Sequence, residues 1–228
     1  MPGTVGNERS IVRLKRILAY HDRENKWLKV YFDKVRFLDG KTGHYNRIFE
    51  GTTGRGVVVV PEDAKGRIGM VRVYRYPVGE WQWELPRGYS EKELTGQENA
   101  ERELKEETGL AARRLQKVGE VFPNTGVLST LIEVFAAREL RGSLGELPLS
   151  EAISDFRFFT HRDLSRMVRQ GELRDGVTLA ALLLCSQAHH TGPSSDRVRM
   201  REAARTLKRN RTLSSRLKNT THESRPAP

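Results

Sequence analysis

Apolar and polar positions alternate along the first third of the chain, which predicts β-strands rather than helices. The pattern becomes strand-like from Ile11. Between Trp27 and Leu38, aromatic and β-branched residues predominate with partial alternation, and Asp39-Gly40 closes this segment as a turn. Tyr45 to Phe49 repeats the pattern over a shorter length, so we expect another strand there.

A run of four valines, Val57 to Val60, interrupts the alternation and predicts a strand that is buried on both faces. Glu62 to Gly66 predicts a turn, and Ile68 to Tyr76 predicts the next strand. We therefore interpret residues 57–76 as a hairpin.

The helix with the strongest local signals covers Gly96 to Thr108. Thr95 and Glu98 form a Thr-x-x-Glu capping box, and Gly109 occupies the position after the helix that favours glycine. Further elements are expected downstream: strands at Leu115–Phe122, Leu131–Ala136 and Phe156–Phe159, an amphipathic helix at His161–Gln170, and a mostly apolar, buried helix at Thr178–Ala188.

The length of 228 residues and the composition indicate a soluble globular protein of one domain with extensions. The longest apolar stretch, about Val177 to Cys185, is far shorter than the ~20 residues needed to cross a bilayer. We expect no secretory signal. Cys185 is the only cysteine, which excludes a disulfide within the chain and fits a reducing cytoplasm.

The net charge of +11 is unevenly distributed. From His189 onward there are ten Lys and Arg against three Asp and Glu, whereas residues 1–188 hold 30 and 26. After Gly192-Pro193 the chain is basic and poor in large apolar residues, so we expect residues 193–228 to be a disordered tail. Ten cations also allow weak contact with nucleic-acid phosphates, although no recognised reading module accompanies them.

Three glutamates gather on one side of the predicted helix. Glu103, Glu106 and Glu107 are spaced i, i+3 and i+4, so they project within an arc of roughly 100°. Like charges at this spacing destabilise a helix, unless a hard cation such as Mg²⁺ or Mn²⁺ lies among them. A solvated acidic helix face is the alternative. Gly88 lies upstream in a Pro-Arg-Gly-Tyr turn that leads through a loop into the helix. A strand, a glycine loop and an acidic helix together favour a site that binds metal and phosphate.

Here the sequence resembles the Nudix family. The box of that family is Gly, five residues, Glu, seven residues, then Arg-Glu-U-x-Glu-Glu-x-Gly-U, where U is a bulky aliphatic residue. The chain has Gly88 and the complete segment from Arg102 to Leu110 at the required spacing.

One box position departs from the family pattern, because Leu94 stands where the first Glu is expected. In the family this Glu mainly braces the loop by pairing with the box arginine, here Arg102. Glu98, one helical turn before Arg102, is the first candidate substitute, and Glu93 is the second.

The resemblance extends over roughly residues 10–190. Val71 to Pro77 resembles the Arg-Gln-Tyr-Arg strand of ADP-ribose pyrophosphatases, and Trp83 to Gly88 resembles their Trp-Glu-Leu-Pro-Ala-Gly segment, with Arg87 in place of alanine. After Gly126 the chain runs Val-Leu-Ser-Thr, where classical members tend to have Phe-Ser-Asp-Glu in the substrate pocket. ADP-ribose is therefore favoured only modestly over other nucleotide sugars.

The resemblance implies a set of metal ligands. Glu103 and Glu107 are the principal ligands, Glu106 shares a second ion, and the backbone carbonyl of Arg87 completes a site. The carbonyl role tolerates the change from alanine to arginine, because the side chain is not used. The ions would be Mg²⁺ or Mn²⁺, bridging phosphate oxygens and activating water.

The resemblance also implies a general base from the loop Gly142 to Ser154. Glu151 is the first candidate and Glu146 the second, although loop glutamates are also ordinary surface residues. Arg75 is the candidate clamp on the diphosphate, with a strand-edge salt bridge as the alternative. Gly88 is expected to contact the substrate. Glu84 would contact the nucleoside or pair with Arg75. Trp81 and Trp83 would stack on the base of the substrate or pack within the protein.

The fold implied is α/β: the Nudix α/β/α sandwich with a mixed sheet, preceded by a small antiparallel sheet. Residues 1–53 would form the N-terminal β subdomain, 54–192 the Nudix domain and 193–228 the tail. The expected activity is Mg²⁺-dependent hydrolysis of a nucleoside diphosphate derivative, in a cytoplasmic homodimer. The alternatives are a catalytically silent Nudix-like ligand sensor, which the intact glutamates argue against, and a nucleic-acid-binding protein acting through its tail.

Overall fold

The computed structural model describes residues 10–21, 24–145, 147–148 and 151–190. Up to Cys185 the chain forms one compact unit. A second unit begins at Ser186, and of it the structure describes only the last turns of one helix. Glu146 and the basic tail lie outside the described residues.

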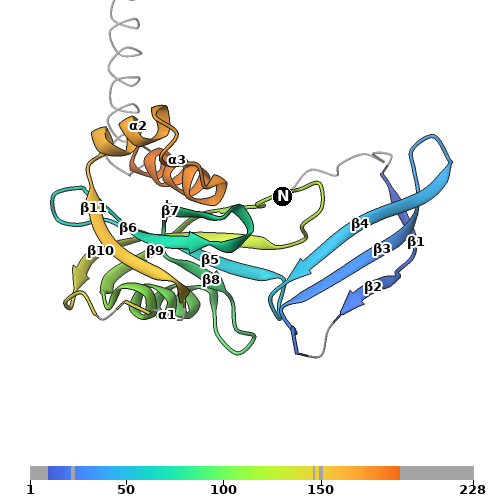
Figure 1. Cartoon of the computed structure of the whole chain (residues 1–228), viewed down its shortest axis with the longest axis horizontal. Coiled ribbons are helices and arrows are strands. Elements are labelled where there is room, and N and C mark those ends of the chain that lie inside the picture. Colours follow the sequence, from blue (N-terminus) through green and yellow to red (C-terminus); the bar gives the residue numbers. More distant parts are fainter. Residues whose placement is uncertain (1–9, 22–23, 146, 149–150, 191–228) are drawn as a thin grey trace, which may run out of the picture. The chain divides into compact units, whose positions relative to one another are not determined.

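The first sheet is built from the alternating N-terminal segments and is antiparallel throughout (Figure 1). β3 pairs with β4 along one edge and with β1 and β2 along the other. Gly40, in the turn between β3 and β4, takes φ +84°, a conformation that glycine adopts at little cost. The strands are β1 (Val12–Lys15), β2 (Leu18–His21), β3 (Leu28–Arg36) and β4 (Thr42–Glu50).

Two further sheets form the body of the unit. The mixed sheet has the order β8-β5-β10-β9, in which only β5 and β10 are parallel. The other sheet is antiparallel, with the order β11-β6-β7. The strands are β5 (Arg55–Pro61), β6 (Ile68–Arg75), β7 (Glu80–Glu84), β8 (Arg87–Tyr89), β9 (Ala111–Val121), β10 (Leu131–Arg141) and β11 (Ile153–Phe159), with a 3₁₀ turn η1 (Tyr76–Val78) before β7.

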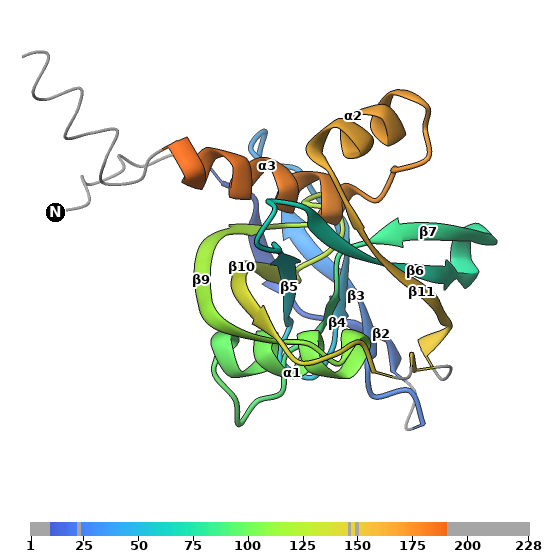
Figure 2. The same cartoon turned by 90° about the vertical axis from the view of Figure 1, so that its left-hand side faces the viewer.

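Helices cover both sides of the body. α1 (Gly96–Thr108) lies on one side of its sheets, and α2 (His161–Arg169) and the first part of α3 (Gly176–His190) lie on the other (Figures 1 and 2). The result is the layered α/β arrangement with a mixed sheet that the sequence predicts.

The predicted hairpin over residues 57–76 is wrong. β5 and β6 belong to different sheets, and a single isolated bridge, Glu62 to Ile68, connects the ends that face the turn. The reason is that both edges of β5 are already occupied, one by β8 and the other by β10. β6 therefore pairs with β7 and β11 instead.

The valine run is buried on both faces, as predicted, with each of the four residues at most 1% exposed. Val58 and Val60 belong to the core that includes Met167 of α2 and Ala181 of α3. Val57 and Val59 belong to a second core, which includes Leu104 of α1. One strand thus serves two hydrophobic cores, because successive side chains point to opposite faces.

Cys185 is buried in the first core, and burial raises the pKa of its thiol, so it remains protonated and unreactive. Among the described residues, none of the helices has the length and apolar character that a membrane span requires.

Candidate active site

α1 begins and ends at the residues that the sequence indicates. The hydroxyl of Thr95 accepts from the backbone N–H of Glu98 at 3.2 Å, and the Glu98 carboxylate accepts from the backbone N–H of Thr95 at 2.7 Å. Gly109 ends the helix with φ +77°. This reciprocal cap fixes the residue at which the helix begins. It therefore also fixes the position of the helix glutamates along the helix axis.

Two of the three glutamates predicted to lie on one side of α1 are buried. Glu103 and Glu107 are each 5% exposed and share a face with Ala100 and Leu104. Glu106, by contrast, has a side chain that is 48% exposed. The solvated-face interpretation therefore fails for Glu103 and Glu107, because carboxylates are rarely buried without a partner.

Gly88 allows the buried carboxylates to approach β8. A Cβ atom at Gly88 would overlap the carboxylate of Glu103, so any other residue there would displace this carboxylate from β8. Next to it, the backbone N–H of Arg87 donates to Oε1 of Glu107 at 3.4 Å. The structure thus brings together the glycine and two of the glutamates that the box resemblance selects.

The carboxylates lie close enough to repel one another. Burial raises the pKa of Glu103 to about 7, and the nearby charges of Glu106 and Glu151 add to this effect against the opposing influence of Arg102. Burial, followed by the charges of Glu103 and Glu151, raises the pKa of Glu107 well above its usual value. Such a site favours either protons or a cation.

Arg102 provides part of the positive charge. Its Nη2 lies 2.6 Å from Oε1 of Glu103, and its Nη1 lies 2.6 Å from Oε2 of Glu106. Within the described parts of the chain, no three His, Cys, Asp or Glu residues form a group that could by itself hold a metal ion. The guanidinium links Glu103 and Glu106 instead.

The expected replacement of the missing box glutamate by Glu98 or Glu93 is wrong. The Glu98 carboxylate is taken up by Thr95, and the acidic residue of the loop that pairs with Arg102 is Glu91, at 3.6 Å. The reason is local: a glutamate at the third helical position turns back to cap the helix and so cannot reach along it.

The loop containing Leu94 is held mainly by Asn99, which the sequence did not single out. The side chain of Asn99 is fully buried. Its Oδ1 accepts from the backbone N–H of Glu91 at 2.9 Å, and its Nδ2 donates to the carbonyls of Leu94 at 3.3 Å and Thr95 at 2.9 Å. These backbone contacts tie the loop to α1 without the box glutamate. The only signal in the sequence was an asparagine in a helix interior, where asparagine is unfavourable.

Arg75 and Arg87 grip the same carboxylate. Arg75 contacts Glu84 through Nε at 3.0 Å and Nη2 at 2.7 Å, so the predicted alternative of a pair between these residues is observed. Arg87 lies 2.6 Å from Glu84 and 3.1 Å from Asp175, which precedes α3. The side chain of Arg87, for which no separate role was predicted, therefore helps to hold Glu84. Because the Glu84 side chain is only 2% exposed, its charge requires such partners.

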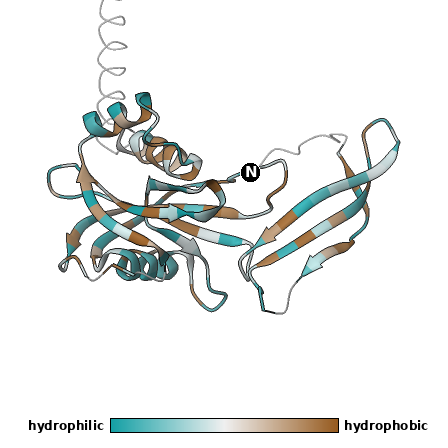
Figure 3. Ribbon diagram, viewed as in Figure 1, coloured by the Kyte–Doolittle hydropathy of each residue, from teal (hydrophilic) through white to brown (hydrophobic). Residues whose placement is uncertain are grey.

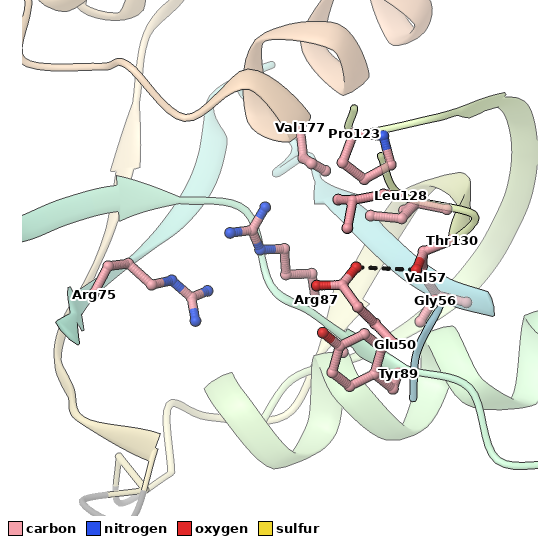
Figure 4. A pocket seen from close by; sticks show the side chains of 12 residues that line it. Glu50, Gly56, Val57, Arg75, Arg87, Tyr89, Pro123, Leu128, Thr130 and Val177 are labelled. Carbon is pink, nitrogen blue, oxygen red and sulfur yellow. Dashed lines mark hydrogen bonds between the residues drawn. The ribbon is translucent and has the colours of Figure 1, made fainter. Parts of the chain in front are cut away.

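A pocket of about 260 Å³ opens beside this arginine pair (Figure 4). Glu50 from β4, Tyr89 from β8 and Thr130 from the segment before β10 lie together on one side of it. Thr130 donates to Oε2 of Glu50 at 2.9 Å. Apolar side chains complete the lining: Val57, Pro123, Leu128, Ile132 and Val177.

The tryptophans predicted as base-stacking candidates do not line this pocket. Trp83 packs edge-on against Phe159, and Trp81 packs edge-on against Tyr74. Trp27, which the sequence analysis placed only in a strand, stacks on Tyr89 with ring centroids 6.2 Å apart. It lies in the turn before β3, so only the three-dimensional path of the chain reveals this contact.

Of the two candidate general bases, the structure describes Glu151 but not Glu146. Glu151 is exposed just before β11, and its charge acts on both Glu103 and Glu107. The structure thus places Glu151 near the buried carboxylates. Glu146 lies outside the described residues.

Residues 52–182 match the model of the NUDIX domain, which is more than half of the chain. The chain belongs to the Nudix family. The matched segment contains Gly88, α1 and both arginines of the pocket, whereas Glu50 precedes it. As a Nudix hydrolase, the protein acts on nucleoside diphosphate derivatives.

Several known proteins are similar to the chain. An ADP-ribose pyrophosphatase of Bacillus subtilis is 28% identical over 69% of the chain and 84% of its own length. An ADP-ribose pyrophosphatase of Mycobacterium tuberculosis is 31% identical over 56% of the chain and 62% of its own length. A CMP-5′-(N-acetyl-N-hydroxy-3-aminopropyl)phosphonate hydrolase of Streptomyces rubellomurinus is 25% identical over 70% and 76%.

The Nudix fold is also found in a solved structure described as an ADP compounds hydrolase. It superimposes with a TM-score of 0.67 at 18% identity and covers 82% of this chain and 97% of its own. The expected fold, a mixed α/β Nudix arrangement, is confirmed.

Proposed function

We propose that the chain hydrolyses the diphosphate bond of ADP-ribose or of a nucleotide sugar in a Mg²⁺-dependent reaction, releasing a nucleoside monophosphate and a phosphorylated sugar. The proposal rests on the proximity of Arg75 to the buried carboxylates of Glu103 and Glu107. The positive charge of Arg75 lowers the pKa of Glu107, against the larger effect of burial. Carboxylates that hold a cation next to a guanidinium suit a diphosphate. The names of the two pyrophosphatase relatives favour ADP-ribose.

The donor set fits Mg²⁺. Glu103 and Glu107 offer hard oxygen ligands, and burial together with nearby carboxylates raises the pKa of both, so a bound cation would stabilise their charged forms. Mg²⁺ commonly uses one or two carboxylates together with substrate phosphates and water, so a complete cage of side chains is not required. We assign Glu106 and the Arg87 carbonyl to complete the ligand set. Bound there, the cation would neutralise phosphate charge and acidify water.

The protein side chains would divide the remaining tasks. Glu151 accepts a proton from the attacking water, whose oxygen bonds to one phosphorus as the bridging P–O bond breaks. We keep Glu146 as the second candidate for this task. Arg75 holds the phosphate, and Glu84 orients its guanidinium. Gly88, which has no side chain, leaves the carboxylate of Glu103 against the backbone of β8.

The test is a substrate panel with the purified full-length chain. ADP-ribose, ADP-glucose, UDP-glucose and a dinucleoside polyphosphate are incubated with Mg²⁺, Mn²⁺ or EDTA, and released phosphomonoesters are measured. We expect hydrolysis of ADP-ribose or a nucleotide sugar, and its loss in EDTA. Binding of the same compounds without turnover would contradict the proposal and favour the ligand sensor.

We also propose that the chain forms a homodimer through its N-terminal sheet. All residues of β1 and β2 are exposed, including Val12, Leu18 and Tyr20. Figure 3 shows apolar residues recurring along the strands of this sheet. Contiguous exposed apolar surface usually marks an interface. A second copy is the natural partner, because such oligomers commonly use the same surface on both subunits.

A further inference from the structure

We propose that Glu50 selects substrates whose nucleoside half carries a ribose rather than a deoxyribose, by accepting hydrogen bonds from the 2′- and 3′-hydroxyl groups. The inference rests on the proposed function and names the part of the substrate that this pocket binds. It gives a specificity-determining role to a residue of the first sheet, before the matched Nudix segment.

The carboxylate of Glu50 is held by a donor from the segment before β10. Thr130, which is 1% exposed, donates to Oε2 at 2.9 Å. The side chain of Tyr89 lies beside Glu50 in the lining of the same pocket. Burial, and then the neighbouring Glu50 charge, raises the pKa of Tyr89, so the phenol stays protonated and remains a donor. The carboxylate is thus held at the pocket wall with lone pairs left for a ligand (Figure 4).

An ionised carboxylate accepts hydrogen bonds and donates none. It therefore repels phosphate oxygens and favours hydroxyl or amino groups. Two adjacent hydroxyl groups match its two oxygens, and an acidic side chain on ribose hydroxyls is the arrangement that dinucleotide-binding folds use.

The location within the pocket favours the sugar over the base. Arg75 and Arg87 line the same pocket as Glu50, and both act electrostatically on Tyr89. A group bound by Glu50 therefore lies close to the arginines that would hold phosphate. In a nucleotide the ribose is joined directly to the phosphate and the base lies one step beyond it. The apolar wall formed by Pro123, Leu128, Ile132 and Val177 suits the base.

Trp27, in the turn before β3, helps to position both Tyr89 and Glu50. Its ring stacks on Tyr89 with an interplanar angle of 16°. The backbone N–H of Gly51, which follows Glu50, donates to the carbonyl of Trp27 at 2.8 Å. Tyr89 and Glu50 are thus anchored to one short stretch of chain, which maintains their relative positions.

The experiment compares two ligand pairs on the purified full-length chain with Mg²⁺. ADP-ribose is compared with the analogue whose adenosine is 2′-deoxy, by kcat/KM, and AMP is compared with 2′-deoxy-AMP, by Kd from calorimetry. We expect the wild type to favour each ribose ligand by about 10-fold or more, the value of a hydrogen bond to a charged group. Glu50→Gln, which keeps the shape, should reduce the preference at least about threefold, chiefly through KM.

Controls separate this role from a structural one. Glu172→Gln makes the same change at an exposed site at the end of α2 and should leave both preferences unchanged. Thr130→Val removes one hydrogen bond to the carboxylate and should give a smaller reduction than Glu50→Gln. If circular dichroism shows that Glu50→Gln does not fold, Thr130→Val alone tests the role of Glu50. A preference for ribose in Thr130→Val equal to that of the wild type would then contradict this role.

A wild-type preference near unity, or an equal loss on both ligands of a pair in Glu50→Gln, overturns the inference. A wild type that hydrolyses neither these two substrates nor any nucleotide sugar of the substrate panel overturns the proposed function instead. The AMP and 2′-deoxy-AMP affinities then still decide the role of Glu50, since they require no turnover.

Discussion

The N-terminal sheet and the body of the first unit are both rich in strands, yet their side chains lie in different surroundings. In β5 every residue from Val57 to Val60 is at most 1% exposed, whereas every residue of β1 and β2 is exposed. Helices cover both sides of the body (Figures 1 and 2). The difference shows that a strand-forming sequence determines local conformation, while burial depends on which layer packs against the strand.

The two regions differ in chemistry as well. The body holds the buried carboxylates and the arginine pair, which are costly to bury and therefore require an exact set of partners. The first sheet contributes Glu50, a single polar group at the end of a strand. We therefore expect changes in the body to alter turnover or stability, and changes in the sheet to alter selectivity or association.

The largest effect should come from Glu107→Gln in the body. The variant keeps the side-chain shape and removes a negative ligand, so kcat should fall by a factor on the order of 10³. The free energy of unfolding should be unchanged or higher, because repulsion from Glu103 is relieved. Steady-state kinetics and urea denaturation measure both quantities. Glu101→Gln on the exposed face of α1 is the matched control, and near-wild-type turnover in Glu107→Gln would remove this residue from the mechanism.

The contrast in burial can be tested with one truncation in each region. Val59→Ala should lower the free energy of unfolding by about 2 kcal/mol, because it removes buried methyl groups and leaves a cavity. This loss should not depend on protein concentration. Leu18→Ala should have a smaller effect that grows with concentration, because Leu18 becomes buried only in the proposed dimer. Leu18→Lys should shift sedimentation toward the monomer, and a wild type that sediments as a monomer at all concentrations would contradict the dimer.

The body should also respond to pH without metal. The pKa of Glu103 is about 7 in the folded state and 4.5 for an unperturbed glutamate, so the folded protein binds more protons between these limits. Its stability should therefore fall as the pH rises from about 4.5 to 7. Mg²⁺ should raise Tm more at pH 7.5 than at pH 5.5, as thermal unfolding with Mg²⁺ or EDTA would show. Glu103→Gln should flatten this difference, and an equal Mg²⁺ effect at both values would argue against the site.

The smallest effect should follow removal of residues 193–228. The candidate catalytic groups all precede residue 155, so kcat should be unchanged. Any change in KM should weaken from low to physiological salt, because ten cations attract anionic substrates through screened charge. Kinetics of the chain ending at Gly192 measure this, and a large loss of kcat at both salt concentrations would show that the tail completes the site.

Local signals account for what the sequence predicted well. The capping box and Gly109 define α1 within a few neighbouring residues, and the box spacing selects Gly88, Glu103 and Glu107 together. The burial of the valine run was likewise predictable from its lack of polar positions.

Partners distant in the sequence account for the failures. The pairing of β5 with β10 and not β6 joins residues 76 positions apart, such as Arg55 and Leu131, which periodicity along the chain does not reveal. Arg87 forms an ion pair with Asp175, 88 positions away in the sequence, and Glu50 accepts a hydrogen bond from Thr130, 80 positions away. Glu98 is an exception, because its possible contacts with Thr95 and Arg102 are both local and the contact with Thr95 that caps the helix is the one that forms.

The division of β5 between two cores has a consequence for how the protein unfolds. Val57 and Val59 pack toward α1, while Val58 and Val60 pack toward α2 and α3. Neither half can lose its packing without exposing the backbone of the strand that the other half needs. We therefore expect the two cores to unfold as one cooperative unit, so that the amide hydrogens of β5 exchange with solvent only when the whole body opens.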